Sequence, residues 1–310
     1  MRTLVLLNRG ADGGKAAIKW RRLEPDLRGL LGGSPTVCVE TEDWAEAVDG
    51  AASADECLIV AAGGDGTVHK VADLILAISC PVSLRIVLGA IGLGSSNDFH
   101  KPRNGAADIA GVPVRCAIAG AAAQNVLRVA YVDDRGAHHV KYAVTSCSLG
   151  MVAAGNDLFN RCWGPVGLSR RLSAAAGIGC ASLAGLLHAR DPSVQLWIDG
   201  SDVYRGQVSL LSVYINPHFA GRLRYLGPTS VSSPYMGIVV VPAIGLWRRV
   251  GLLRRAAGVG LGAGGDVQTW EGISCEMKLN EASPLEIDGE VVRIREARVM
   301  LVPGALRVCR

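Results

Sequence analysis

Aromatic residues are scarce in this chain: phenylalanine, tryptophan and tyrosine make up 5% of its 310 residues. Proteins that bind single-stranded nucleic acid without sequence preference stack the bases on aromatic side chains, so this composition argues against that class. The formal net charge of +4 is also too small to indicate a polyanionic partner. We therefore expect no nucleic-acid partner.

Paired cysteine motifs are missing as well, because the nine cysteines are scattered singly and no C-x-x-C pair occurs. Zinc ribbons and redox motifs are disfavoured on this ground, and an odd, dispersed set of thiols is typical of a reducing compartment. The opening MRTLVLLNRG predicts a strand that runs into a loop, not a signal peptide. The longest weakly apolar stretch, at 172–188, is rich in Ala, Gly and Ser and too short to span a bilayer comfortably. These features predict a cytoplasmic protein.

A turn of glycines with one carboxylate in it, Gly63-Gly64-Asp65-Gly66-Thr67, follows the apolar run 58–62. The turn matches neither the dinucleotide G-x-G-x-x-G pattern nor the phosphate loop G-x-x-x-x-G-K-[ST]. Glycines nevertheless let backbone N–H groups approach a phosphate, and the helix expected at 68–78 would place its N-terminus behind them. The turn therefore indicates phosphate chemistry, although such turns also occur merely for tight packing.

The first third of the chain alternates strands with helices. Apolar runs predict strands at 3–7, 36–40, 58–62 and 85–88, and helical spacing predicts helices at 15–31, 44–52 and 68–78. This order is typical of an α/β fold with a parallel sheet, in which ligands bind at the carboxyl ends of the strands. The loops at Asn8, Gly63 and Gly92 all fall at such ends, so we expect them to converge.

The pattern changes near Gln124. Short strand-like runs follow, at 125–132, 138–145, 194–198, 207–214, 237–241, 273–279 and 285–287. They predict a mostly antiparallel β domain interrupted by helical segments at about 168–188 and 245–257. The hydrophobic content of 49% is sufficient for a large core in each part.

Four stretches, in order, carry a resemblance to a known family: Leu7-Asn8-Arg9-Gly10 through Lys15-Ala16, with Arg9 in place of a proline; Gly63 to Thr67; Leu88 to Phe99 (LGAIGLGSSNDF); and Pro284 to Glu290 (PLEIDGE), followed by the closing Pro303-Gly304-Ala305-Leu306. Together they resemble the diacylglycerol kinase catalytic-domain family, which includes bacterial lipid kinases, sphingosine kinases and ceramide kinases and has a fold related to that of NAD kinases. The motifs span nearly the full chain.

The resemblance implies two domains: a nucleotide-binding α/β domain over 1–124, with a returning tail at about 295–310, and an acceptor-binding β-sandwich domain over 125–294. It implies an ATP-dependent kinase that uses Mg²⁺ and phosphorylates a hydroxyl group of a lipid or lipid-like acceptor. Phosphoryl transfer depends mainly on positioning and charge neutralisation, so a small set of residues suffices.

The resemblance also implies the roles of individual residues. Glu290 matches the family's general base, and Asp65 and Asp288 are the expected carboxylates for magnesium or the phosphate network. The residues expected to bind the nucleotide are Asn8, Thr41, Gly64, Asp65, Gly66, Thr67, Gly94, Ser95 and Asn97. Without the family context, Asp288-Gly289 reads equally well as a hairpin turn.

Departures from the family pattern leave alternatives open. After the glycine turn the family usually has a small or β-branched residue and then Asn-Glu, whereas this chain has Val68-His69-Lys70. The stretch 232–235 (SSPY) stands where bacterial members carry the Asp of a structural magnesium site. We therefore expect no such metal site. A kinase for a soluble hydroxylated metabolite and a non-catalytic nucleotide-binding regulator are the alternative hypotheses.

The segment 246–255 (LWRRVGLLRR) reads as a basic amphipathic helix, with Leu246, Trp247, Val250 and Leu253 on one side. A helix of this kind can lie in an anionic membrane interface, although it also resembles an ordinary surface helix. Peripheral membrane contact is thus a further expectation.

Overall fold

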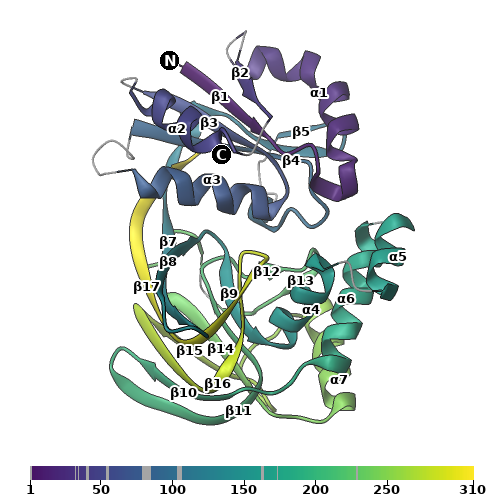
Figure 1. The fold of residues 1–310 in the computed structure, drawn as a ribbon, viewed down its shortest axis with the longest axis vertical. Helices are drawn as coiled ribbons and strands as arrows, with labels where there is room; N and C mark the ends of the chain where they lie inside the picture. The colour runs from purple at the N-terminus through teal and green to yellow at the C-terminus, as the bar shows by residue number, and fades with distance from the viewer. Residues whose placement is uncertain are drawn as a thin grey trace. The chain divides into compact units, whose positions relative to one another are not determined.

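The computed structural model describes residues 2–31, 33, 35–39, 42–53, 56–78, 85–102, 107–161, 164–172, 174–227 and 230–310. The chain divides into two compact units, Met1–Gln124 with Gly304–Arg310 (unit 1) and Asn125–Pro303 (unit 2). The tail that belongs to unit 1 thus starts at Gly304 and not near residue 295. Both units combine strands and helices, so the fold is mixed α/β (Figure 1).

Unit 1 contains a mixed sheet. Its strands are β1 (Arg2–Leu7), β2 (Thr36–Cys38), β3 (Cys57–Gly63), β4 (Ile86–Gly92), β5 (Ala107–Ile109) and β6 (Val112–Arg115). Strand β1 pairs in parallel with β2 and β3, and β3 pairs in parallel with β4. Strand β6 is antiparallel to β4 and β5, whereas the end of β17 (Glu290–Val308) pairs in parallel with β4.

The helices of unit 1 bury an apolar stripe on this sheet. In α1 (Ala16–Leu30) the stripe consists of Trp20, Leu23 and Leu27, which share a core cluster with Val5 and Val60. Helix α2 (Trp44–Ala52) contacts β1 and β3, and α3 (Asp65–Ala77) contacts β3 and β4. Because side chains alternate along a strand, burial on both faces requires the near-continuous apolar runs seen in β1, β3 and β4.

Two element boundaries of unit 1 differ from the sequence expectation, and both matter for the site. Helix α3 begins at Asp65 instead of Val68, so half of the glycine turn is the first turn of the helix. Strand β4 continues to Gly92, because residues 89–92 pair with 60–63 of β3 where a turn was expected. A Cβ on Gly89 would lie 3.1 Å from the carbonyl oxygen of Arg115, which explains the glycine within this strand.

The strands of unit 2 pair antiparallel with one another. They are β7 (Ala122–Asp133), β8 (His138–Ala143), β9 (Ser146–Gly150), β10 (Ser193–Ile198), β11 (Ser201–Tyr214), β14 (Met236–Pro242), β15 (Gln268–Gly272), β16 (Ser274–Ile287) and β17, with the short β12 (His218–Phe219) and β13 (Leu223–Arg224).

Strands β11 and β16 each serve two pairings. The first half of β11 pairs with β10, and its second half lies between β14 and β9. The first half of β16 also pairs with β10, whereas its second half pairs with β9. Register shifts between Val208 and Leu210 and between Lys278 and Ser283 mark the places where the two strands change partners. Such irregularities let a strand bend from one layer to another, so the two strands expected at 273–279 and 285–287 are one.

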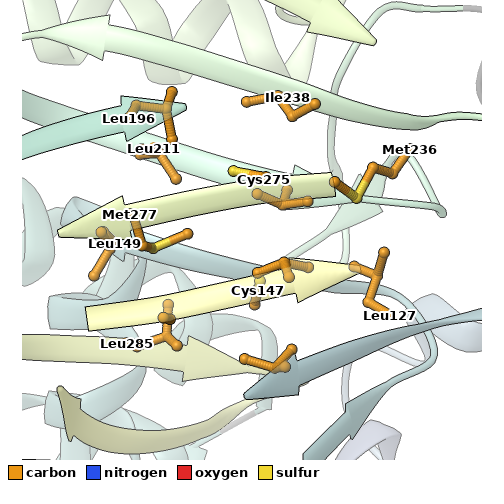
Figure 2. Close-up of a cluster of buried hydrophobic side chains, with 14 of the residues drawn as sticks. Leu127, Cys147, Leu149, Leu196, Leu211, Met236, Ile238, Cys275, Met277 and Leu285 are labelled. Atoms are coloured by element: carbon orange, nitrogen blue, oxygen red, sulfur yellow. The ribbon is translucent and has the colours of Figure 1, made fainter. Parts of the chain in front are cut away.

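The main core of unit 2 lies between these layers. Figure 2 shows side chains from several strands pointing into it, among them Leu149, Leu211, Met277 and Leu285. Since neighbouring side chains on a strand point to opposite faces, Glu286 lies on the face opposite to that of Leu285 and Ile287. Asp288 follows in the turn after the strand, and both carboxylates are buried.

Four helices complete unit 2: α4 (Met151–Asn160), α5 (Gly164–Leu172), α6 (Ala174–His188) and α7 (Leu246–Ala257). Helix α4 was not expected from the sequence. Helix α6 carries no charged residue before His188 and packs against α4 and α5. Within the described ranges, no helix has both the length and the apolar character needed to cross a membrane.

Candidate active site

Three loops of unit 1 meet at the carboxyl ends of β1, β3 and β4, as the alternating pattern predicts. The Nδ2 group of Asn8, directly after β1, donates a hydrogen bond of 3.0 Å to Oγ1 of Thr67. The backbone N–H of Leu93, directly after β4, donates one of 2.8 Å to the carbonyl oxygen of Gly63. The loop at Gly63 is thus hydrogen-bonded to both of the others.

The two glycine turns approach each other closely. A Cβ on Gly94 would lie 2.3 Å from the Cα of Gly64, so neither backbone can accept a side chain there without moving. Gly66 is exposed, and a Cβ built on it would meet no atom within 4 Å. The N-terminus of α3, whose first N–H groups lack intrahelical acceptors, is therefore open at Gly66.

Asp65 is the first residue of α3, and the third loop holds its carboxylate. Its Oδ2 accepts a hydrogen bond from Oγ of Ser96 at 2.7 Å, and its Oδ1 accepts one from the backbone N–H of Phe99 at 2.9 Å. Burial, and secondarily the negative charge of Asp98, raise the pKa of Asp65 to about 6. A cation beside Asp65 would offset both effects, which makes this carboxylate a plausible partner for a metal-bound phosphate.

Asn97 and Ser95 differ in what they can do. Asn97 is buried in a left-handed conformation, φ 48°, and its side chain bonds the backbone of Gly92 and Gly94. It therefore holds the third loop in shape, and its own amide group points into that loop. Ser95 is exposed, and it is its neighbour Ser96 that contacts Asp65.

Lys19 is a site residue that the sequence analysis missed. Its Nζ donates to Oδ2 of Asp12 at 2.9 Å and to the carbonyl oxygen of Leu93 at 3.2 Å, so it links the first loop to the third. The two partners lie 7 and 74 residues away along the chain. No local pattern could have indicated this bond. Thr41, which was expected to bind the nucleotide, lies outside the described residues.

In unit 2, Asp288 and Gly289 form a two-residue hairpin turn between β16 and β17. Ile287 pairs with Glu290, and both turn residues have positive φ, 46° and 91°. This geometry is that of a type I′ turn, for which Asp-Gly is a preferred sequence. The hairpin interpretation of the D-G-E motif is therefore correct, and it is compatible with a functional role for the residue that follows.

The carboxylate of Asp288 is fully engaged. Its Oδ2 accepts from the N–H of Val144 at 2.6 Å, and its Oδ1 accepts from the N–H groups of Thr145 and Ser146 at 3.0 and 2.9 Å and from the hydroxyl of Thr145. A magnesium ion would have to displace these donors. Asp288 therefore orders residues 144–146, and its expected role as a magnesium ligand stays a prediction.

Two other side chains hold the same turn. The N–H of Gly289 donates to Oε1 of Glu286, and Nδ2 of Asn160 on α4 donates to the carbonyl oxygen of Gly289 at 2.8 Å. Glu290 follows directly and is half-exposed, and its Oε1 accepts a hydrogen bond of 2.5 Å from Nζ of Lys141 on β8. The sequence analysis missed Glu286, Asn160 and Lys141, because no local pattern links them to the turn.

A metal centre built from protein side chains alone is not found: among the described residues, no group of three or more His, Cys, Asp or Glu side chains is arranged to hold a metal ion. Residues 232–235 stand where bacterial members of the family carry the Asp of a structural magnesium site. In this stretch the carbonyl oxygen of Ser233 accepts a hydrogen bond of 2.6 Å from Nδ2 of Asn125.

Comparison with known proteins gives three results. Residues 2–126 match the family model of the diacylglycerol kinase catalytic domain. A solved structure of a candidate diacylglycerol kinase from Bacillus anthracis str. Sterne is 17% identical, with a TM-score of 0.71, and the match covers 99% of this chain and 96% of that one. A second structure of a diacylglycerol kinase from the same strain is 15% identical, with a TM-score of 0.64 and the same coverage. No curated protein matches the sequence.

At this low identity the solved structures establish the fold alone, whereas the family model bears on the three loops described above. The resemblance that the sequence motifs indicated is therefore confirmed: the N-terminal region of this chain, residues 2–126, is similar to the diacylglycerol kinase catalytic domain, and the chain as a whole has the fold of these kinases.

Proposed function

We propose that the protein is an ATP-dependent phosphotransferase that phosphorylates a hydroxyl group of a lipid or lipid-like acceptor. The observation that carries the proposal is the position of Asp65, at the open N-terminus of α3 and beside two glycine turns in close contact. A helix N-terminus with accessible N–H groups favours phosphate groups.

The residues present fit a nucleotide phosphate chain. Gly66 is exposed at the start of α3, and Gly64 and Gly94 let the two turns pack together. Thr67 and Asn8 fix the loop that begins α3. Lys19, which pairs with Asp12, lies beside the third loop. We assign phosphate binding to the backbone of these loops, and we assign Asn97 the role of holding the third loop in shape.

The proposed Mg²⁺ ion would be held by Asp65 together with the phosphates of ATP. Magnesium is commonly bound by one or two carboxylates and by substrate phosphates, without a cage of protein ligands. The raised pKa of Asp65 supports this assignment, because a nearby cation would stabilise its ionised form. When bound, the ion would neutralise charge on the transferred phosphoryl group.

Glu290 is the proposed general base, which takes the proton of the acceptor hydroxyl group. Its half-exposed carboxylate is accessible, in contrast to the buried carboxylates of Glu286 and Asp288. These two buried residues and Asn160 hold the turn that precedes it, so the position of Glu290 along β17 is well defined.

A soluble hydroxylated metabolite remains the second candidate for the acceptor. The observation in its favour is the stretch Ser232-Ser233-Pro234-Tyr235, which lacks a carboxylate where bacterial members of the family carry one. A lipid acceptor, by contrast, would require contact with a membrane surface.

Helices α6 and α7 provide a candidate membrane contact, and on α7 the side expected from the sequence is the exposed one, with Leu246 39% exposed. The buried residues of α7 are Arg249, Leu252 and Ala256, while Trp247 is 85% exposed. Two leucines of the neighbouring α6, Leu183 and Leu187, are 51% and 54% exposed. A helix that is apolar all round is normally buried on all sides, so an exposed leucine stripe on α6 favours a partner surface.

The charges around this stripe favour an anionic partner. Arg249 makes a two-pronged ion pair with Asp191 and donates to the carbonyl oxygen of Leu186, so it joins α7 to the end of α6. Arg248 and Arg254 remain exposed. Nη1 of Arg248 forms an ion pair with Oδ1 of Asp266 at 3.3 Å. Apolar side chains flanked by arginines are typical of a surface that docks on anionic lipids.

The test of the proposed function is phosphoryl transfer from labelled ATP, with total lipid extract and aqueous extract as separate acceptor pools. We expect label in the lipid pool, and we expect Asp65→Asn to lower turnover by orders of magnitude. Asp49→Asn is the matched control, because Asp49 is an exposed aspartate on α2 of the same unit. Full activity of Asp65→Asn would refute the site, and label in the aqueous pool alone would favour the soluble acceptor.

A further inference from the structure

The ion pair at the start of β17 has no role in the function described so far. Lys141 lies on β8, and its Nζ is 2.5 Å from Oε1 of Glu290. The two residues are 149 positions apart in the sequence, so the contact exists only because β8 and β17 are brought together in unit 2. Both side chains are partly exposed, which leaves the pair accessible to a substrate.

This contact changes Glu290 in two ways. A half-exposed glutamate otherwise samples several rotamers, and a bond to the ammonium group restricts them. The positive charge also favours the ionised carboxylate, which is the only form that can accept a proton. A base that is both oriented and ionised is ready to act before the acceptor arrives.

We infer that Lys141 is a positioning residue for Glu290, because its ammonium group holds the carboxylate in one orientation. The inference rests on the proposed function of Glu290 as the base.

The other charged groups around the turn are already engaged. Glu286 and Asp288, on the same hairpin, accept hydrogen bonds from Gly289 and from residues 144–146. On α4, Asp157 and Arg161 pair with each other at 2.7 Å. Among the bonds described around the turn, that from Lys141 is made to the carboxylate of Glu290 itself, so its removal acts directly on the orientation of that carboxylate.

The experiment compares Lys141→Met with Lys141→Arg, which keeps the charge. In the methionine variant we expect kcat to fall about tenfold, because the carboxylate loses its fixed orientation. The arginine variant should restore most of kcat, and KM for ATP should stay within about twofold in both. Lys278→Met is the control, because Lys278 is an exposed lysine on β16 with no ion pair among the described residues.

A second readout does not depend on activity. The side chain of Glu290, followed by NMR relaxation, should be more mobile in Lys141→Met than in the wild type. Unchanged mobility of this side chain, or an unchanged kcat in Lys141→Met, would overturn the inference. Full activity of Glu290→Gln would instead refute the proposed base, and a more mobile Glu290 in Lys141→Met would in that case leave the ion pair established without a part in the reaction.

Discussion

Two Asp-Gly hairpins in unit 2 have the same turn geometry but differ in the burial of the aspartate. The comparison predicts how much each carboxylate contributes to the stability of the fold. Asp199-Gly200 joins β10 to β11, and Asp288-Gly289 joins β16 to β17; the φ angles are 49° and 82° in the first turn and 46° and 91° in the second. Each carboxylate accepts hydrogen bonds from a neighbouring segment, Asp199 from the N–H groups of Ile273 and Ser274. Asp199 is exposed, whereas Asp288 is 4% exposed.

The cost of removing each carboxylate follows from this difference. Asp288→Ala leaves three buried N–H groups and one hydroxyl group of residues 144–146 without their acceptor. Each unsatisfied buried donor costs about 1–3 kcal/mol, and because such costs do not add fully we expect about 3–5 kcal/mol in total. Asp199→Ala should cost only about 0.5–1.5 kcal/mol, because water can replace its carboxylate.

The asparagine variant refines the test. Oδ1 of Asp288 receives three of the four donors, so an amide oxygen placed there keeps most of the bonds, while the new NH₂ group faces the N–H of Val144. Asp288→Asn should therefore lose about 1–3 kcal/mol, between wild type and alanine. Urea unfolding gives the stabilities, and hydrogen exchange of the 144–146 amides shows where protection is lost. Equal losses for Asp288→Ala and Asp199→Ala, or a loss under about 1 kcal/mol for Asp288→Ala, would refute the reasoning.

Three further predictions concern the loops of unit 1 and the surface of α7. Gly94→Ala places a Cβ 2.3 Å from the backbone of the facing turn, so ATP binding measured by calorimetry should be lost, whereas Gly50→Ala, which meets nothing within 4 Å, should bind normally. Since the pKa of Asp65 is raised from 3.8 to about 6, the native state binds more protons than the unfolded state between these values, and this group's contribution to stability falls as pH rises through that window. The melting temperature of Asp65→Asn relative to wild type should therefore increase from pH 4 to 7, and a flat difference would contradict the shift. Wild type should co-sediment with anionic vesicles at low salt and less so at high salt. Trp247→Ala should weaken this binding severalfold, whereas Ile273→Ser, at another exposed apolar position, should not. Equal binding of both variants would exclude the α7 surface.

Much of unit 1 could be predicted from the sequence because its signals are local. Apolar runs of strand length alternate with helical spacing, and this order puts the carboxyl end of each parallel strand at the same edge. The convergence of the loops at Asn8, Gly63 and Gly92 follows from that rule, and the hydrogen bonds among them confirm it. The glycines at 64 and 94 were recognisable from their motifs, although the reason for them, the contact between the two turns, was not.

Unit 2 was less predictable because its strands are defined by partners far away in the chain. Strands β11 and β16 were expected to be shorter or divided, since a bulge interrupts the local pattern where each strand changes partners. On α7, the sequence showed an amphipathic helix but not which side is buried. Arg249 is the buried cation because Asp191, 58 residues away, pairs with its Nη2 group, and backbone carbonyl oxygens accept hydrogen bonds from the rest of its guanidinium group.

The sequence by itself thus determined the α/β order of unit 1, the loops that meet at one edge of its sheet, and the Asp-Gly turn before Glu290, because propensity, periodicity and glycine geometry act between near neighbours. Only the tertiary structure decided what the carboxylates do. Asp65 and Asp288 look alike as motif residues, but the first lies at an open helix end and the second is enclosed by the donors of residues 144–146. The bond from Lys141 to Glu290 was likewise decided by the tertiary structure, because a contact across 149 residues depends on strand pairing that no short segment encodes.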